Sequence, residues 1–200
     1  MRTAELKLIN NFVDKKNPKF ELNGMLLDKV NKKIVATNTR ALIVYECADL
    51  EVDGILHKSA IELALKSVVG KNEKDVVFHS RDGAMYDFYT RPVLDIQTLI
   101  TEDRDPKEGA IISMPTIDGI YPNYERIQFD VNGKDVKTCV STHKTIYRDI
   151  AQFGAIVDAQ YLKPLVEYMK LRDYIGTIYY REANMPVLIK CVDATLFICQ

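Results

Sequence analysis

The chain has 200 residues, enough for one large domain or two domains of about 100 residues each. Hydrophobic residues make up 47% and charged residues 28%, and the chain contains nine glycines and seven prolines. These values are typical of a globular protein and exclude collagen-like repeats and extensive disorder. The net charge of −1 gives no global signal for nucleic acid or membrane, so such a signal must come from the charge distribution.

Neither a membrane span nor a signal peptide is expected from the apolar runs. No run reaches the ~20 residues that a membrane-spanning helix needs, and the N-terminus lacks an uninterrupted apolar stretch. We therefore expect a cytoplasmic protein without a membrane partner. The cysteines form no CxxC motif, which predicts free thiols in or near the core rather than disulfides or metal ligands. They are Cys47, Cys139, Cys191 and Cys199.

The first hundred residues predict two helices and several strands. Thr3 is placed to cap a helix over residues 4–15, and Gly70 is placed to end a second helix over residues 56–69. The apolar face of the first helix would hold Leu6, Ile9, Phe12 and Val13. Strand-like runs cover 20–27, 34–38, 41–47, 75–80, 84–90 and 92–100. The runs 75–80 and 84–90 predict a hairpin, and 92–100 an edge strand.

In the second half of the chain, the strongest signal is a hairpin closed by Asn132-Gly133. Apolar and polar residues alternate over 125–131 and 136–141 on either side of it. A short helix is predicted within 142–153, and a strand over 155–157 leads to a fourth helix. Asp158 is a good N-cap for that helix, which reaches about residue 171 despite Pro164. The last predicted strands cover 175–181, 186–192 and 195–199.

The order of elements repeats along the chain. Helix 56–69, followed by two strands, has a counterpart in helix 159–171, which two further strands also follow. The polar stretch 101–110 separates them and predicts a linker. We therefore expect an α+β protein with two similar units, 1–105 and 106–200, each covering one face of an antiparallel sheet with helices.

The signatures of common catalytic sites are absent. The sequence contains no GxGxxG, P-loop, HExxH or GxSxG motif. His57, His79 and His143 are scattered, and the acidic clusters at 49–53 and 102–105 lack the spacing of a calcium loop. We therefore predict no catalytic residues, no metal and no cofactor. An enzyme whose pocket residues are dispersed along the sequence remains an open alternative.

The charge is distributed unevenly between the helix-bearing segments and the rest of the chain. Residues 1–20, 56–72 and 142–172 together carry a net charge of +7, which leaves −8 for the remainder. Basic helices can approach a phosphate backbone while the acidic remainder faces away from it. Charges spaced by four residues, as in Lys58, Glu62 and Lys66, equally fit a solvated helix face held by weak ion pairs.

One stretch resembles a known family. Residues 117–127 read Ile-Asp-Gly-Ile-Tyr-Pro-Asn-Tyr-Glu-Arg-Ile. They resemble the segment that joins the second and third domains of bacterial DNA sliding clamps, the beta subunit of DNA polymerase III. There an Asp-Gly pair precedes Tyr/Phe-Pro-Asp/Asn-Tyr and a basic residue. Further segments are similar to the family's strands and last helix, in the family's order: 34–42, 155–162, 185–189 and 194–198.

The resemblance implies a DNA-clamp-like fold with antiparallel sheets outside and helices facing DNA. It implies a non-catalytic processivity or DNA-tethering factor that binds double-stranded DNA without reading sequence, with a DNA polymerase or another replication protein as possible partner. A homo-oligomer is expected, because three copies of two domains would complete a six-domain ring. The residues expected to face phosphates are Lys7, Lys58, Lys66, Lys144, Arg148, Lys163 and Lys170. The alternative is a clamp-fold protein-interaction module that does not encircle DNA.

Overall fold

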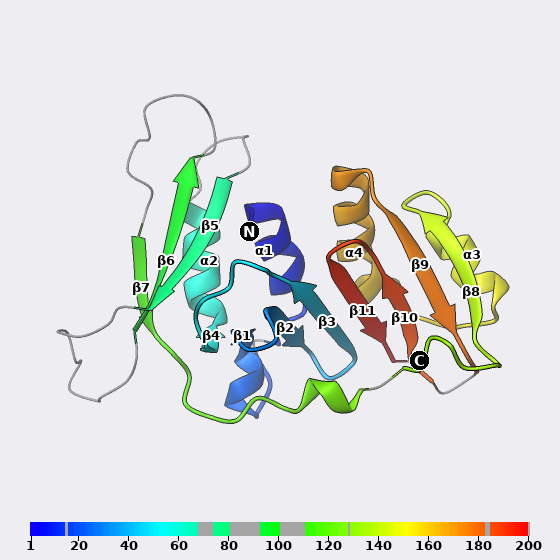
Figure 1. The fold of residues 1–200 in the computed structure, drawn as a ribbon, viewed down its shortest axis with the longest axis horizontal. Helices are drawn as coiled ribbons and strands as arrows, with labels where there is room; N and C mark the ends of the chain where they lie inside the picture. Colours follow the sequence, from blue (N-terminus) through cyan, green and yellow to red (C-terminus); the bar gives the residue numbers. More distant parts are fainter. Residues whose placement is uncertain are drawn as a thin grey trace.

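The structure is a computed structural model, and two antiparallel sheets make up its framework (Figure 1). It describes residues 1–14, 16–67, 74–80, 93–100, 111–127, 129–182 and 185–199. The large sheet has eight strands in the order β4-β1-β2-β3-β11-β10-β9-β8, and the small sheet has three in the order β5-β6-β7. Every strand pair within both sheets is antiparallel, as the sequence predicts.

The strands come from both halves of the chain. The first half supplies β1 (Gly24–Asp28), β2 (Lys33–Thr37), β3 (Ala41–Glu46), β4 (Gly54–His57), β5 (Lys74–Ser80) and β6 (Val93–Ile100). The second half supplies β7 (Ile111–Pro115), β8 (Lys137–Thr142), β9 (Ile175–Tyr180), β10 (Val187–Lys190) and β11 (Ala194–Ile198). Because β3 pairs with β11 over five residue pairs, strands from the two ends of the chain form one continuous sheet.

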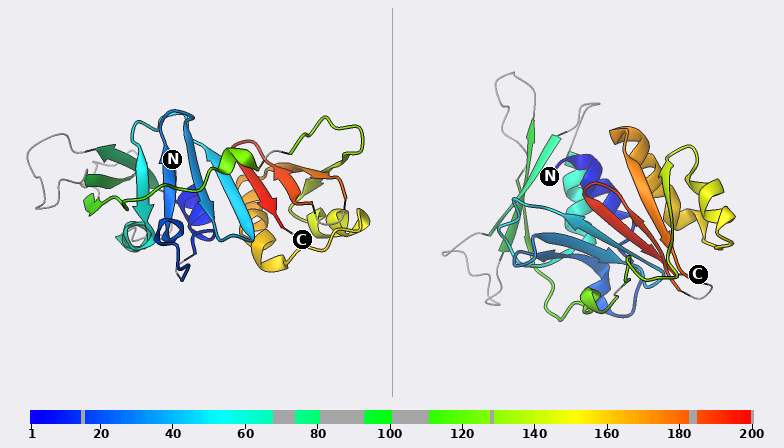
Figure 2. Two further views of the ribbon diagram at one scale, coloured as in Figure 1. Left: turned by 90° about the horizontal axis from the view of Figure 1, so that it is seen from below. Right: turned by 45° about the vertical axis from the view of Figure 1, so that its right-hand side comes forward.

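The four α-helices lie on the same side of the strands (Figure 2). They are α1 (Thr3–Asn10), α2 (Lys58–Ser67), α3 (Ile146–Gln152) and α4 (Ala159–Arg172). Helix α1 contacts both α2 and α4, so these three form a row. The predicted apolar face is confirmed for Leu6 and Ile9 of α1, and Phe12 and Val13 are buried in the same core although they follow the end of the helix. Apolar burial between helices and strands stabilises this layer arrangement.

The segment between β7 and β8 crosses the opposite face of the large sheet (Figure 2). Ile117 and Tyr121 are buried there against Val35 and Leu42, in a second apolar cluster that is separate from the helix-side core. The Tyr124 hydroxyl also donates a hydrogen bond to the Asp28 carboxylate at 2.7 Å. The stretch that carries the family resemblance therefore crosses the outer face of the sheet.

The predicted hairpin around Asn132-Gly133 is wrong. Residues Tyr124–Arg126 form a 3-10 helix (η2), and β8 pairs with β9 instead of with a preceding strand. Glu125, Arg126 and Ile127 are all exposed, so the apolar residue of this alternating stretch does not pack against a core. Alternation predicts a strand only where one face meets a core.

Several predicted boundaries also differ from the structure. Helix α1 ends at Asn10, and its N-cap is Arg2 rather than Thr3. Residues Phe20–Asn23 form a 3-10 helix (η1) before β1 begins. The segment 155–157 contains no strand. Strand β6 is central in the small sheet rather than at its edge; it pairs with β5 on one side and β7 on the other.

Other predictions are confirmed or lie outside the described residues. The Asp158 carboxylate accepts a hydrogen bond from the Gln160 backbone N–H at 2.9 Å, which confirms the N-cap of α4, and Pro164 lies inside this helix. The predicted strand 84–90, the linker 101–110 and Gly70 lie outside the described residues. The division at residue 105 stays a prediction, and β7 belongs to the sheet of β5 and β6. No helix in the described ranges is long and apolar enough to span a membrane.

Candidate nucleic-acid interface

The exposed charged side chains of the helix layer are mostly basic. Within their observed bounds the four α-helices contain seven basic and four acidic residues, a net charge of +3. The larger value of +7 for the helix-bearing segments includes basic residues that the structure places outside the helices. Among the exposed charged residues of the helices, five are basic and only Glu167 is acidic. The basic ones are Lys7, Lys66, Arg148, Lys163 and Lys170.

Four of these side chains lie on the row formed by α2, α1 and α4. Lys7 is on α1, Lys66 is on α2, and Lys163 and Lys170 are on α4. Each is exposed while its helix buries the opposite face, because a helix alternates faces every three to four residues. Lys163 lies 3.9 Å from Glu167, with both side chains about 70% exposed (71% and 68%), an ion pair that water screens strongly. We call Lys7, Lys66, Lys163 and Lys170 the helix-row lysines.

Lys58 makes structural contacts in addition to the phosphate contact predicted for it. Its ammonium group donates hydrogen bonds to the carbonyl oxygens of Asn10 at 3.1 Å and Val13 at 2.7 Å. These carbonyls lie at and just beyond the end of α1, where a helix leaves acceptors without intrahelical partners. Lys58 therefore ties α2 to the end of α1 and is partly buried, a structural contact that sequence spacing does not reveal.

We expect Lys58→Met to lower the free energy of unfolding by about 1–2 kcal/mol, because two carbonyls lose a charged donor. Lys66→Met, on the same helix and exposed, should change stability by less than about 0.5 kcal/mol. Urea denaturation of both variants followed by circular dichroism measures this difference. Equal stability of the two variants would show that the Lys58 contacts contribute nothing.

Lys144 and Arg148 lie apart from the row formed by α2, α1 and α4. Lys144 immediately precedes α3, and Arg148 lies on α3. Lys144 is exposed, and Arg148 forms an ion pair of 3.0 Å with the buried Asp149. The Ser141 hydroxyl donates a hydrogen bond of 2.6 Å to Asp149. This bond, together with those from Thr145 and Arg148, holds the pKa of Asp149 below its usual range. Arg148 thus has one structural contact besides its exposed surface.

A buried polar cluster connects α1, α4 and the turn between β10 and β11. The Glu5 carboxylate accepts hydrogen bonds from the guanidinium of Arg172 and from the backbone N–H of Arg2. The Tyr168 hydroxyl donates to Asp193 at 2.8 Å and also lies 3.3 Å from Glu5. Because Glu5 and Arg172 are 167 positions apart, sequence spacing gave no signal for this cluster.

The electrostatics of this cluster follow from burial. Burial raises the pKa of Asp193, and the negative charge of Glu5 raises it further, while the hydrogen bond from Tyr168 and the charge of Arg172 act in the other direction. Burial and the bond to Asp193 also hold the pKa of Tyr168 well above its usual range. The cluster links α1 to α4 at the contact between these two helices.

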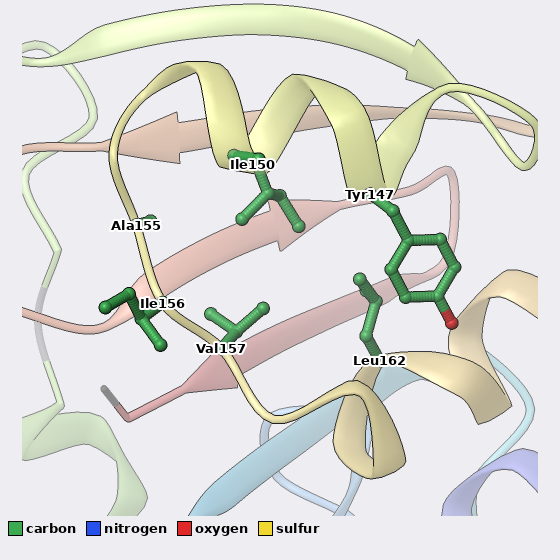
Figure 3. A pocket seen from close by; sticks show the side chains of 7 residues that line it. Tyr147, Ile150, Ala155, Ile156, Val157 and Leu162 are labelled. Carbon is green, nitrogen blue, oxygen red and sulfur yellow. The ribbon is translucent and has the colours of Figure 1, made fainter.

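An apolar pocket lies between α3 and the start of α4 (Figure 3). Tyr147 and Ile150 project into it from α3, Leu162 from α4, and 155–157 pass along its floor. The pocket encloses about 250 Å³. Ile156 is 82% exposed at its rim. No titratable side chain other than the Tyr147 phenol lines it, so it offers apolar contact and no acid or base.

The remaining candidates for chemistry are isolated. All four cysteines are free, as predicted, although Cys199 is exposed rather than near the core. The imidazole of His57 lies 2.6 Å from the Ser59 hydroxyl and stacks on Phe20. In the described part of the chain, no group of three or more His, Cys, Asp or Glu residues is placed to hold a metal ion.

Comparison with solved structures identifies the fold. The chain matches the Helicobacter pylori beta clamp bound to a DNA ligase peptide with a TM-score of 0.65, over 98% of this chain and 62% of that one, at 14% identity. The fold is that of a bacterial DNA sliding clamp. A Pseudomonas aeruginosa DNA polymerase sliding clamp gives a TM-score of 0.64 at 11% identity, covering 100% of this chain and 64% of the other.

The Caulobacter crescentus DNA polymerase sliding clamp matches similarly, with a TM-score of 0.63 at 11% identity. This chain spans less than two thirds of the length of these clamps. No protein-family model matches the sequence, and no curated protein sequence matches it. At this level of identity the comparison establishes the clamp fold, and what the chain does must be argued from its own surface.

Proposed function

We propose that this chain is a non-catalytic DNA-tethering factor that works in the cytoplasm and holds duplex DNA against its helix layer. The observation that carries the proposal is the excess of exposed basic side chains on the helices, five against one acidic residue. The clamp fold supports it, because that fold places helices together on one side of the sheets. Metal and cofactor chemistry have no part in this function.

The expected contact is electrostatic and indifferent to sequence. Lysine ammonium groups on flexible stems can follow phosphates without fixed geometry, and contacts to phosphates carry no information about the bases. Neutralising phosphates releases condensed counterions, so the affinity depends steeply on salt. Such contacts permit the protein to move along the duplex while staying bound.

We expect the chain to bind duplexes of unrelated sequence equally, with an affinity that falls steeply between about 50 and 200 mM salt. Fluorescence anisotropy with labelled linear duplexes measures this, and nicked circular DNA tests whether closed DNA is retained better. No binding at low salt to either substrate, or a clear preference for one sequence, contradicts the proposal.

The partner proteins we propose are a second copy of the chain and a DNA polymerase or another replication protein. The Helicobacter pylori clamp was solved with a DNA ligase peptide, which supports a replication protein as the kind of partner. A homo-oligomer would offer each DNA molecule several helix layers. Once one layer is bound, the others are held close to the same DNA at a high effective concentration, which strengthens the overall binding.

The second candidate is a clamp-fold interaction module without DNA encirclement. Two observations favour it: Lys58 and Arg148 have structural contacts, and the pocket between α3 and α4 is apolar. If no DNA substrate is bound at low salt, this module becomes the better account of the fold.

A further inference from the structure

The buried cluster around Tyr168 contains more hydrogen-bond acceptors than protons. The Tyr168 hydroxyl lies 2.8 Å from Oδ2 of Asp193 and 3.3 Å from Oε1 of Glu5. A phenol has one proton to donate, so two carboxylates share a single donor. The second oxygen of Asp193, Oδ1, is buried and has no hydrogen-bond partner among the residues that the structure describes. An ionised carboxylate at Asp193 therefore receives too few donors for a buried charge.

The charges of the cluster do not balance when both carboxylates are ionised. The guanidinium of Arg172 is directed at Glu5, with Nε 3.1 Å from Oε1 and an ion pair through Nη2. This pair compensates the charge of Glu5 and leaves that of Asp193, and a buried charge without its own partner is costly. Burial accordingly raises the pKa of Asp193, and the negative charge of Glu5 raises it further.

The other titratable side chains around Asp193 bring no positive charge to it. They come from β3, the residue after it, α4, the loop before β9 and the turn itself: Tyr45, Cys47, Tyr168, Tyr174 and Cys191. Burial raises the pKa of Tyr45, Tyr168, Cys47 and Cys191, so these four stay protonated around neutral pH. Glu5 and Arg172 are then the charges that act on Asp193.

A proton on Asp193 would correct both the shortage of donors and the excess of negative charge. The protonated carboxyl can donate to the oxygen of the Tyr168 hydroxyl, which frees the phenolic proton to donate to Glu5. Each of the two close oxygen–oxygen contacts then contains a proton, and the charges of Glu5 and Arg172 cancel. Connected hydrogen bonds of this kind strengthen one another in a buried site.

We infer that Asp193 takes up a proton from solvent in the folded chain and that this proton holds α1 against α4. The hydrogen bonds then run from the turn between β10 and β11, through Tyr168 of α4, to Glu5 of α1, where the two helices contact each other (Figure 1). When the proton leaves at higher pH, a second buried negative charge faces one guanidinium and the contact between α1 and α4 weakens. The fold thus contains a pH-sensitive joint between its first helix and its C-terminal half.

The direction of the pH dependence follows from linkage. The folded chain binds the Asp193 proton more tightly than the unfolded chain does, because the pKa of Asp193 is raised in the fold. The stabilisation by this proton is complete below the ordinary pKa of an aspartate and is lost as the pH rises through the raised pKa. Asp149 is the opposite case, because the hydrogen bond from Ser141 holds its pKa below the usual range. Its contribution is present above the ordinary pKa and is lost as the pH falls.

Melting curves of Asp193→Asn and the wild type at about pH 4 and about pH 8 test the inference. The asparagine amide is uncharged at both values and can donate an N–H to Tyr168, so it mimics the protonated acid. We expect nearly equal melting temperatures at the lower pH. At the higher pH the variant should melt above the wild type, by about 3–5 °C for each tenfold difference in proton affinity between the folded and the unfolded chain. Asp149→Asn is the matched control and should melt below the wild type at the higher pH.

An Asp193→Asn variant that melts below the wild type at the higher pH, or that differs from it equally at both pH values, overturns the inference. Amide hydrogen exchange at the higher pH locates the effect: α1 should exchange more slowly in the variant, and unchanged exchange there contradicts a joint at α1.

Carbon-13 NMR of the side-chain carboxyl carbons gives a second test on the wild-type chain. The Asp193 signal should titrate above the ordinary range of an aspartate, and titration within that range overturns the inference even where the variant does not fold. None of these measurements involves DNA, so their outcome is independent of the proposed function.

Discussion

Replacing Arg172 with alanine is expected to lower the free energy of unfolding by about 3 kcal/mol, because the Glu5 carboxylate is then buried without its guanidinium partner. The side chain of Glu5 is 5% exposed and that of Arg172 15%, so water cannot replace the lost contact. The substitution acts at the α1–α4 contact, and urea denaturation monitored by circular dichroism measures it.

Two variants separate this effect from simple truncation. Lys163→Ala, also on α4 but at an exposed ion pair, should cost less than about 0.5 kcal/mol. Glu5→Gln combined with Arg172→Met removes both charges and keeps an acceptor for the Arg2 backbone N–H, so it should lose less stability than Arg172→Ala alone. If the double variant is less stable than the single one, burial of an unpaired charge is not the cause.

Replacing the four helix-row lysines with alanine is expected to weaken duplex binding by about tenfold or more at low salt. Each lost phosphate contact removes about 0.9 from the slope of log affinity against log salt concentration, so the slope should flatten by about 3 to 4. The loss should be the same for all sequences, because no base-reading contact is removed.

The fold should tolerate this change. All four side chains are exposed on the outer faces of α1, α2 and α4, where single substitutions shift stability by about 0.5 kcal/mol or less. Alanine also favours helix. A circular dichroism spectrum and a melting curve equal to those of the wild type would show that reduced binding reflects lost charge rather than unfolding.

Much of the fold could be predicted from local patterns. The strands β2, β3, β9, β10 and β11 coincide with apolar runs bounded by turns, and the carboxylate of Asp158 caps α4 as expected. These elements form where one buried face repeats with a fixed period. The antiparallel layer arrangement followed from these patterns, whereas the clamp resemblance came from the residues of 117–127 and the short segments in the family's order. Both agree with the structure.

The features that were missed depend on contacts between distant residues. The stretch 125–131 alternates like a strand in sequence, but its residues 125–127 are exposed, so the pattern alone was misleading. From the sequence alone, Lys58 is predicted to be a solvated charge on a helix. Its contacts with the end of α1 depend on the packing of α1 against α2. Glu5 and Arg172 meet only because β3 pairs with β11 and brings α1 against α4.

The central claim is that duplex DNA contacts the helix layer. A duplex titration by fluorescence anisotropy tests it most directly when two variants of equal charge loss are compared. One replaces the four helix-row lysines with alanine, and the other replaces four exposed lysines outside the α-helices, Lys19, Lys29, Lys134 and Lys190. We expect the first variant to lose binding and flatten the salt slope while the second binds nearly as the wild type does. Equal loss in both variants, or a greater loss in the second, would contradict a helix-facing duplex.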